Sequence, residues 1–460
     1  MKKYDVIIIG AGPAGIFTAL ELTEKNENLK LLLIEKGKDI EKRYCPLKDK
    51  KVPCQNCKSC SIVSGWGGAG AFSDGKLTLT TEFGGWLDEY IGKSKVAQLI
   101  NYVDRIYLRF GATKIVHGTN SKKVRELQQK AATADLRLIP ARVKHLGTEK
   151  CFNILKDMRD YLNPKMDILT STIVSKILVE DNAVKGVVTK DGKEYRGDYV
   201  VCAPGREGAE WFAEEASRLD LDMMSNPVDI GVRVEVPSVV IEHITDVVYE
   251  SKLVFYSKLF DDKVRTFCMN PYGEVVMENN SGLMTVNGHS YADKKTDNTN
   301  FALLVSKTFT EPFKEPITYG KYIASLANIL GGGVLVQRLG DLLAGRRSTK
   351  ERIGRGLVEP TLKEATPGDL SLVFPYRHLM DIIEMLEAID KIAPGVYSRH
   401  TLLYGVEVKF YSSRLKLTNK LETQVKNLFA VGDGADVTRG LAQASASGVL
   451  VAGEILKRIG

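Results

Sequence analysis

Residues 5–15 read DVIIIGAGPAG, and this stretch predicts a buried strand, a tight turn and the start of a helix. The apolar run 6–9 suits a parallel strand that is covered on both faces. Glycines follow at positions 10, 12 and 15, in G-x-G-x-x-G spacing, ahead of the helical pattern IFTALELTEK. In this motif the glycines permit the turn, let a pyrophosphate approach the backbone, and allow close packing of helix on strand. The helix N-terminus supplies N–H donors and positive potential.

A second predicted strand, residues 31–34, ends in Glu35, twenty residues after Gly15. An acidic side chain at this place is expected to meet a ribose hydroxyl of the ligand. A glycine triplet alone is a weak signal, because a tight turn without a ligand also uses glycine. Strand, triplet, helix, second strand and terminal carboxylate together predict that the chain binds a dinucleotide.

Composition sets broad bounds. The chain has 460 residues, 44% hydrophobic and 26% charged, which suits a globular protein of two or three closely joined domains. It contains no apolar run of the roughly 20 residues needed to span a bilayer. The sequence passes from Met-Lys-Lys straight into a strand, which is not a signal-peptide pattern. We therefore expect a cytoplasmic location and no membrane partner.

The net charge is +7, from 64 basic and 57 acidic side chains. Part of this excess is concentrated between Lys36 and Lys58, where eight lysines and arginines surround a group of cysteines. Such a cluster is either a solvated loop or a docking patch for an acidic substrate or protein, such as a ferredoxin. The sequence contains no nucleic-acid-binding motif, so no nucleic-acid partner is expected.

The C-terminal region indicates which dinucleotide is bound. Residues 425–434, VKNLFAVGDG, predict a strand ending in Gly432-Asp433-Gly434, and a helix rich in small residues follows Gly440. This pattern resembles the second FAD motif of the glutathione-reductase-like flavoproteins. The resemblance implies that Asp433 contacts the ribityl or pyrophosphate group and that the helix N-terminus faces the N1–C2=O edge of the flavin. Reduced flavin carries negative charge at that edge, which a helix N-terminus stabilises.

A third element lies at residues 198–208, DYVVCAPGREG, a strand running into Ala203-Pro204-Gly205. It resembles the strand–A-T-G motif of the same superfamily, with Pro204 in place of Thr. FAD elements near residues 10, 200 and 430 predict a discontinuous domain built from both ends of the chain. No second G-x-G-x-x-G has strand and helix flanks. The electron donor is therefore expected to be NAD(P)H bound transiently, a protein, or the substrate.

Four of the seven cysteines lie together, at positions 45, 54, 57 and 60. Their C-x8-C-x2-C-x2-C spacing brings several thiolates within reach of one centre, which favours a metal site. A [4Fe-4S] cluster is suggested by C-x2-C-x2-C with an additional Cys-Pro, whereas zinc usually takes two separate C-x2-C pairs. Redox-active thiols and unligated cysteines are the alternatives. The nearby lysines favour the thiolate form in every case.

A glycine-rich segment follows the cysteines, SGWGGAGAFSDGKL from Ser64 to Leu77. So many small residues predict the close approach of something large to the backbone. We expect this segment to line the isoalloxazine ring. The alternative is a flexible linker, which the bulky Trp66 and Phe72 disfavour.

The middle of the chain supplies the candidate catalytic residues. His145 precedes a helix for which Thr148 is the expected N-cap, and it is either a loop histidine or a flavin or substrate contact. Residues 165–201 alternate as an antiparallel β-meander would. Residues 220–310 are rich in predicted strands that would carry a substrate pocket with Arg265, Cys268 and His289. Cys268 has apolar neighbours, so an inert core cysteine is the competing interpretation.

These motifs assign a set of residues to the cofactor. The set is Gly10, Gly12, Pro13, Ala14, Gly15, Glu35, Lys36, Gly67, Gly68, Ala69, Gly70, Ser73, Asp74, Ala203, Gly205, Gly432, Asp433, Gly440, Leu441, Ala442 and Gln443. The metal candidates are Cys45, Cys54, Cys57 and Cys60, and the catalytic candidates are Cys268, His289, Arg265 and His145.

The predicted fold is α/β, a glutathione-reductase-like Rossmann domain with a β-meander and a second α+β substrate domain. The FAD domain is expected at 1–215, including the cysteine loop 45–60 and a helical insertion 92–135, and again at 401–460. The substrate domain is expected at 216–400.

The chain resembles, along essentially its whole length, a bacterial family of FAD-dependent dehydrogenases. The motifs that carry this resemblance are Cys45-Pro46, C-x2-C-x2-C at 54–60, GGAGAFSDGKL, VRTFCMNPYGEVV and GDGADVTRGLAQASASG. The resemblance implies FAD, a cytosolic setting and an oxidoreductase that transfers hydride at the flavin to or from a small organic substrate. It supplies no substrate. The alternatives are a thiol or disulfide oxidoreductase using Cys57 and Cys60, and a flavin redox sensor or electron carrier.

Overall fold

The chain divides into two compact units, which are described separately. Unit 1 comprises Met1–Ile115, Lys144–Met224 and Ser412–Gly460, and unit 2 comprises Val116–Val143 and Ser225–Tyr411. The computed structural model describes residues 3–46, 57, 59–72, 75–224, 227–280, 282–290, 295–307, 309, 316–409 and 414–460. Among these residues, no helix combines the length and the apolar character needed to cross a bilayer.

Unit 1 is built on a seven-stranded sheet with the order β6-β2-β1-β9-β8-β7, in which β21 also pairs with β9. Four strands run parallel to one another, β6 (Asp167–Leu169), β2 (Leu31–Ile34), β1 (Lys3–Ile9) and β9 (Glu194–Cys202), and β21 (Leu428–Ala430) runs parallel to β9. The antiparallel strands β8 (Ala183–Thr189) and β7 (Val174–Glu180) form the expected meander with β9. The prediction that both chain ends contribute strands to one sheet is confirmed.

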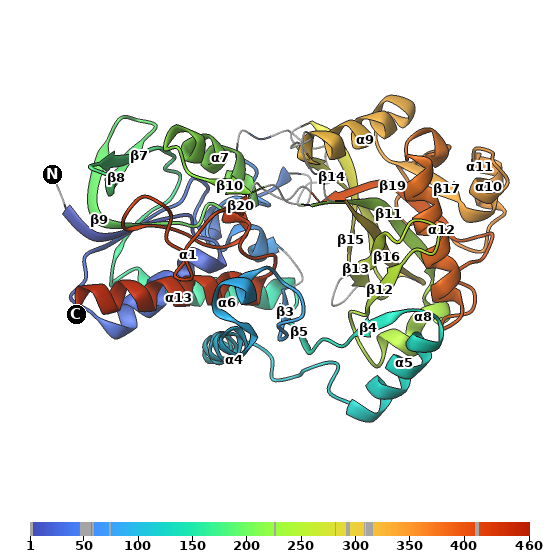
Figure 1. The fold of residues 1–460 in the computed structure, drawn as a ribbon, viewed down its shortest axis with the longest axis horizontal. Helices are drawn as coiled ribbons and strands as arrows, with labels where there is room; N and C mark the ends of the chain where they lie inside the picture. Colours follow the sequence, from blue (N-terminus) through green and yellow to red (C-terminus); the bar gives the residue numbers. More distant parts are fainter. Residues whose placement is uncertain are drawn as a thin grey trace. The chain divides into compact units, whose positions relative to one another are not determined.

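Two helices from opposite ends of the chain pack on this sheet side by side, as Figure 1 shows. They are α1 (Pro13–Lys25), with proline in its first turn, and α13 (Leu441–Ile459). Val6, Ile7 and Ile8 of β1 are fully buried, as a strand covered on both faces requires. The sheet and these helices form one hydrophobic core.

The remaining elements of unit 1 are short or peripheral. The helices are α3 (Leu87–Ile91), α4 (Lys93–Arg109), α6 (Thr148–Leu162) and α7 (Ala209–Arg218), and the short strands are β3 (Lys76–Thr78), β5 (Val143–His145), β10 (Met223–Met224) and β20 (Arg414–Leu415). The 3₁₀ turns are η1 (Ile40–Lys42), η2 (Gly68–Phe72), η3 (Arg206–Gly208) and η5 (Asp433–Ala435). The expected cap of α6 was wrong: Gly147, with φ 79°, is the N-cap, because the chain turns there through a conformation that favours glycine.

Unit 2 contains an eight-stranded, mainly antiparallel sheet with the order β18-β17-β19-β11-β16-β13-β12-β4. Its strands are β18 (Thr366–Pro367), β17 (Leu335–Arg338), β19 (Leu402–Lys409), β11 (Val228–Pro237), β16 (Asn298–Lys307), β13 (Lys263–Asn270), β12 (Lys252–Tyr256) and β4 (Arg137–Ile139). A hairpin of β14 (Glu274–Asn280) and β15 (Leu283–His289) lies nearby.

The two faces of the unit 2 sheet differ in polarity. Alternate residues of β11, from Ile230 to Val236, join a core with residues of the helices α5 (Ser121–Thr133), α8 (Ser238–Thr245), α9 (Pro316–Gly331), α10 (Leu339–Leu343) and α12 (Tyr376–Asp390). The intervening side chains include Asp229, Arg233 and Glu235, all buried and polar. The unit is completed by α11 (Lys350–Gly354) and η4 (Leu370–Leu372).

The predicted helical insertion 92–135 does not lie in one unit. Its first helix, α4, belongs to unit 1, whereas α5 and β4 belong to unit 2. The physical reason is strand pairing: β4 forms the edge of the unit 2 sheet against β12, from Arg137 opposite Val254 to Ile139 opposite Lys252. The chain therefore passes from one unit to the other at four places, after residues 115, 143, 224 and 411.

Candidate functional site

The glycine turn after β1 contains two kinds of glycine. A Cβ on Gly10 (φ 99°) would lie 2.2 Å from the Ala203 carbonyl oxygen, and one on Gly15 would lie 2.0 Å from the Gly10 carbonyl oxygen. Packing therefore requires both. Gly12 has an ordinary φ of −79°, and a Cβ there would meet no atom of the described part of the chain within 4 Å. The chain does not itself need glycine at position 12, which fits a residue kept small for a ligand.

Glu35 binds the glycine turn and the glycine-rich segment together. Its Oε2 accepts the Ala11 N–H at 2.8 Å, and its Oε1 accepts the N–H groups of Gly37 at 2.8 Å and Gly65 at 2.9 Å. The side chain is buried, and these three hydrogen bonds use most of the acceptor positions of the carboxylate. Oε2 retains one acceptor position, which is what a ribose hydroxyl requires.

The glycine-rich segment packs against the turn and is no free linker. Gly67 donates its N–H to the Ala11 carbonyl at 2.7 Å, and a Cβ on Gly68 would lie 3.2 Å from Gly12 Cα. A Cβ on Gly70 would lie 2.9 Å from a methyl of Leu441, the first residue of α13. The segment thus borders the N-termini of both α1 and α13. Ser73 and Asp74 lie outside the described residues.

Arg43 holds the start of this segment and the two residues Ser61 and Ile62 before it by hydrogen bonds. Its guanidinium donates to the carbonyls of Ser61 (2.9 Å), Ile62 (2.9 Å), Trp66 (2.7 Å) and Gly68 (2.8 Å). Burial lowers its pKa to about 10, against the stabilising charges of Glu35 and Cys60. For Arg43 the interpretation as a solvated loop cation was therefore wrong, because four loop carbonyls enclose the side chain.

The C-terminal motif meets the first one at Gly432. Gly432 has φ 76°, and a Cβ there would lie 3.0 Å from the Cβ of Ala14. Asp433 accepts from Thr438 Oγ1 at 2.9 Å and from Arg206 at 3.2 Å. A Cβ on Gly434 would lie 2.5 Å from the Gly205 carbonyl oxygen. The three motifs near residues 10, 200 and 430 therefore lie at one edge of the sheet.

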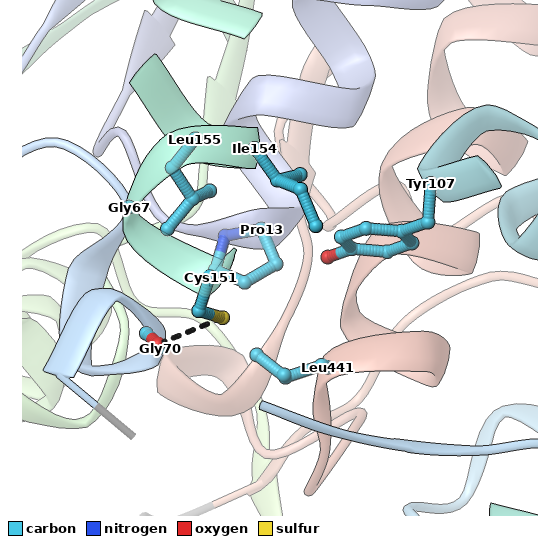
Figure 2. A pocket seen from close by; sticks show the side chains of 8 residues that line it. All are labelled: Pro13, Gly67, Gly70, Tyr107, Cys151, Ile154, Leu155 and Leu441. Atoms are coloured by element: carbon cyan, nitrogen blue, oxygen red, sulfur yellow. Dashed lines mark hydrogen bonds between the residues drawn. The ribbon is translucent and has the colours of Figure 1, made fainter. Parts of the chain in front are cut away.

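A small pocket opens at this edge (Figure 2). Side chains of Tyr107, Ile154 and Leu155 point into it, and Cys151 Sγ lies 3.5 Å from the Gly70 carbonyl oxygen. The lining residues are Pro13, Gly67, Gly70, Tyr107, Cys151, Ile154, Leu155 and Leu441. Its volume of about 10 Å³ is room for about one water molecule.

Three buried polar atoms around this edge have no hydrogen-bond partner among the described residues. They are Ser64 Oγ in the glycine-rich segment, Trp86 Nε1 before α3, and Gln443 Oε1 in the first turn of α13. Buried polar groups are normally paired, so three orphans on segments bordering the predicted cofactor site indicate a polar ligand. With Gly12 and Gly440, where a Cβ would also meet nothing within 4 Å, they fit a dinucleotide. Sequence reasoning missed Trp86, although Gly84-Gly85-Trp86 resembles a second glycine–aromatic motif.

Two further candidates lie in unit 1. Of the two interpretations of His145, the loop histidine was wrong, because His145 is the last residue of β5, which pairs with β3. Its contact with flavin or substrate stays a prediction. Lys36 donates to the carbonyl and the carboxylate of Glu207, at 3.2 and 3.1 Å, and this pair is partly exposed.

The other catalytic candidates lie on the polar side of unit 2. Arg265 forms an ion pair with Asp229 and lies over the Phe267 ring at 4.8 Å. Lys409 lies 5.5 Å from the same ring. Burial lowers the pKa of Lys252 to about 7, with further repulsion from Arg265. The structure thus places Arg265 and Lys409 against the same aromatic ring, with Lys252 close enough to Arg265 to be repelled by its charge. Lys252 and Lys409 were not among the sequence candidates.

Cys268 lies in a β-bulge. The register between β13 and β16 shifts between Phe267 and Asn270, and Cys268 has φ 42°. Its carbonyl accepts from Arg233 at 2.7 Å and from Asn270 at 2.9 Å. Bulges re-aim side chains and are frequent beside active sites. Cys268 is only partly buried, unlike an inert core cysteine. His289 ends β15, opposite Glu274.

Three cysteines of the predicted metal site are among the described residues: Cys45 is partly buried, and Cys57 and Cys60 are exposed. Cys54 lies outside the described residues. Within the described part of the chain, no three His, Cys, Asp or Glu side chains stand close enough together to hold a metal ion. A metal centre on these cysteines remains a prediction.

A protein of Clostridium beijerinckii without a known function is 27% identical over 490 residues, covering 99% of this chain and 81% of its own. The solved structures that this chain resembles include formate oxidase (13% identity, TM-score 0.47, 99% of this chain and 98% of that one) and L-proline dehydrogenase from P. horikoshii (12%, 0.42, 99% and 94%). Glycine oxidase from Bacillus cereus is a third (14%, 0.40, 99% and 96%).

Family models match two parts of the chain. Residues 5–51 match the model described as lycopene cyclase protein. Residues 227–410, nearly all of unit 2 after its first segment, match the model described as FAD-dependent protein, C-terminal domain-like. Over residues 227–410, the chain is thus similar to the C-terminal domain of FAD-dependent proteins.

Proposed function

We propose that this protein is an FAD-dependent oxidoreductase that transfers hydride between the flavin and a small organic substrate. The observation that carries this proposal is the convergence, at one edge of the unit 1 sheet, of two helix N-termini and a glycine-rich segment. Gly12 and Gly440 stand one before each helix, and a Cβ on either would have no atom of the described residues within 4 Å. The relation of unit 2 to FAD-dependent proteins supports it independently.

In this proposal, different groups of unit 1 bind different parts of FAD. The N-terminus of α1 provides N–H donors and positive potential for the pyrophosphate. Glu35 Oε2 accepts a ribose hydroxyl, and the N-terminus of α13 supports the pyrimidine edge of the flavin. When bound, FAD supplies the two-electron chemistry. The glycine-rich segment admits the ring close to its backbone.

Unit 2 provides the substrate groups in this proposal. Arg265 and its neighbours would orient a polar or carboxylate-bearing substrate, and Cys268 and His289 are candidates for proton transfer or contact. His145, which belongs to unit 1, is a further candidate. The electron donor would be NAD(P)H bound transiently, or an acidic carrier such as a ferredoxin. We place the reaction in the cytoplasm and expect neither nucleic-acid nor membrane partners.

The proposal is tested by flavin content and reduction. The purified protein should show flavin absorbance or take up FAD, and one of NADH, NADPH and reduced ferredoxin should bleach it anaerobically. A screen of enoates and disulfides would then identify the substrate. Colourless protein that takes up no FAD would overturn the proposal.

A matched pair of variants tests the site itself. G12A places a methyl where the ligand would approach, and G453A places one on α13 where it meets nothing within 4 Å. We expect G12A to weaken FAD binding at least tenfold with an unchanged unfolding temperature of the apoprotein, and G453A to bind FAD normally. Normal binding by G12A would count against the site.

A second candidate function uses Cys57 and Cys60 as a redox pair. Cys60 interacts electrostatically with the buried Arg43, so a cation lies close to one member of the pair. In this reaction the two thiols lose two electrons and two protons, forming one disulfide, while a substrate disulfide is reduced to two thiols. C57S and C60S should then abolish disulfide reduction and leave FAD binding intact. Activity unchanged in both variants would exclude this function.

A further inference from the structure

The segment before α3 is fastened along the start of α13. Trp86 donates its backbone N–H to the Val437 carbonyl at 2.9 Å, and Arg439 donates to the Gly84 carbonyl at 2.8 Å. Gly85 has φ 136°, and a Cβ there would lie 2.5 Å from Thr438 Cα. The two segments are therefore in backbone contact, and this fixes the position of Trp86 relative to α13.

Gln443 presents a buried acceptor in the first turn of α13. Its Nε2 donates to the Phe83 carbonyl at 3.1 Å, which identifies the other amide atom as oxygen. The side chain is 2% exposed, and Oε1 has no partner among the described residues. A buried, oriented acceptor without a donor is costly, so a ligand donor is expected there.

Trp86 presents a buried donor on the neighbouring segment. Its Nε1 also has no partner in the described part of the chain. The indole is flanked by two guanidinium groups, that of Arg439 at 5.2 Å and that of Arg414 at 5.8 Å from the ring centre. Arg414 is itself held by Tyr90 Oη at 3.0 Å and by Glu89 at 2.8 Å. The direction of the indole N–H is therefore set by the protein.

We propose that Gln443 and Trp86 bind the pyrimidine edge of the flavin. This inference rests on the proposed function. That edge presents an acceptor, a donor and an acceptor in order: C2=O, N3–H and C4=O. The free N–H groups at the start of α13, Gln443 Oε1 and Trp86 Nε1 form the complementary donor, acceptor and donor. Gln443 accepts from N3–H, and Trp86 donates to C4=O.

The Gln443 contact is tested with an analogue that lacks the N3–H. Wild-type apoprotein should bind 3-methyl-FAD about three- to tenfold more weakly than FAD, the effect of losing one neutral hydrogen bond. Q443L should bind the two flavins alike, whereas Q443E, which keeps an acceptor, should still discriminate. Equal discrimination by wild type and Q443L would overturn the assignment of Gln443.

The Trp86 contact is tested by W86F, which keeps an aromatic ring and removes the N–H. The matched control is W211F, since Trp211 Nε1 already donates to the Ser175 carbonyl at 3.2 Å. W86F should weaken FAD binding about three- to tenfold and lower the flavin midpoint potential, because a donor at C4=O stabilises the electron-rich reduced ring. A potential identical to that of W211F would overturn the assignment of Trp86.

These outcomes separate the inference from the function beneath it. If the wild-type protein binds no FAD, the proposed function fails. If it binds FAD while both variants behave like wild type, only the assignment of the two side chains fails. Unfolding temperatures of the apo variants show whether either substitution disturbs the fold.

Discussion

Arg233 and Glu407 form a bidentate ion pair in the middle of the unit 2 sheet, and both side chains are completely buried. Arg233 Nε donates to Oε2 at 2.8 Å and Nη2 to Oε1 at 2.9 Å. Its other donors reach the Cys268 carbonyl, Asn300 at 3.2 Å and Asn287 at 3.0 Å. Every N–H of the guanidinium is thus used within the protein. Arg233 therefore fixes three strands and the bulge, and it is not available to clamp a substrate.

R233M should destabilise the protein by about 3–5 kcal/mol, because it leaves Glu407 buried with its main partner removed. Denaturant unfolding of the variant measures this loss. The control is R196Q, since Arg196 pairs with Glu180 on the surface and such pairs contribute about 0–1 kcal/mol. Similar losses in the two variants would contradict the role assigned to Arg233.

The contact between the two chain ends depends on Gly448. A Cβ there would lie 2.2 Å from the Ala14 carbonyl oxygen and 2.8 Å from Thr18 Oγ1. G448A should therefore push α13 from α1 and cost about 1–3 kcal/mol, with weaker FAD binding. G453A on the same helix should be neutral or stabilising by up to about 1 kcal/mol. Thermal unfolding distinguishes the two, and a stable G448A would show that the helices separate without cost.

His378 should make unit 2 sensitive to mild acid. The ring is buried, its nitrogens have no hydrogen-bond partner among the described residues, and burial lowers its pKa to about 4. In the unfolded chain it takes up its proton near pH 6.5. Its contribution to stability is complete above pH 6.5 and is lost as the pH falls toward 4.

The stability difference between H378F and wild type isolates this group. From pH 7 to pH 4 it should shift progressively in favour of H378F, as measured by urea unfolding. For Asp381 the dependence of stability on pH has the opposite sign, because burial and the neighbouring Asp262 raise its pKa. Its contribution is lost as the pH rises, so D381N should gain relative stability toward pH 7. A constant difference across the range in H378F would contradict the assignment.

Arg43 should be needed to order the glycine-rich segment. R43M removes the donors to four loop carbonyls, so we expect FAD binding to weaken more than tenfold. We also expect proteolysis between residues 57 and 72 to accelerate. R105M is the control, because Arg105 lies over the Tyr102 ring on α4, away from this segment. Wild-type protease resistance in R43M would show that the segment is ordered by other contacts.

The cysteine group is tested by metal content. If Cys45, Cys54, Cys57 and Cys60 hold a metal, anaerobically purified protein contains iron or zinc, and C57S/C60S loses it. C151S is the control, since Cys151 is buried elsewhere in unit 1. An iron–sulfur cluster would also give broad absorbance at about 400 nm, beyond the flavin bands. Wild-type protein without iron or zinc would leave the cysteines as thiols.

Local sequence patterns predicted the secondary-structure elements that carry the candidate site. The G-x-G-x-x-G turn, the strand before Glu35, the meander and the helix after Gly440 were all predicted, because each depends on residue periodicity and on glycine at tight turns. The roles of Trp86, Arg43 and Lys252 were not predicted. Each depends on partners far away in the chain, such as Val437 for Trp86 and Trp66 for Arg43.

The sequence by itself determined that both ends of the chain contribute parallel strands to one sheet, since the three motifs near residues 10, 200 and 430 are short and local. Tertiary structure alone decided which unit received residues 116–143, because an edge strand takes its place from the partner it pairs with. It alone decided which polar groups were left without partners, Gln443 Oε1 and Trp86 Nε1 among them. Hydrogen-bond satisfaction is a property of the packed chain, and no stretch of residues carries it.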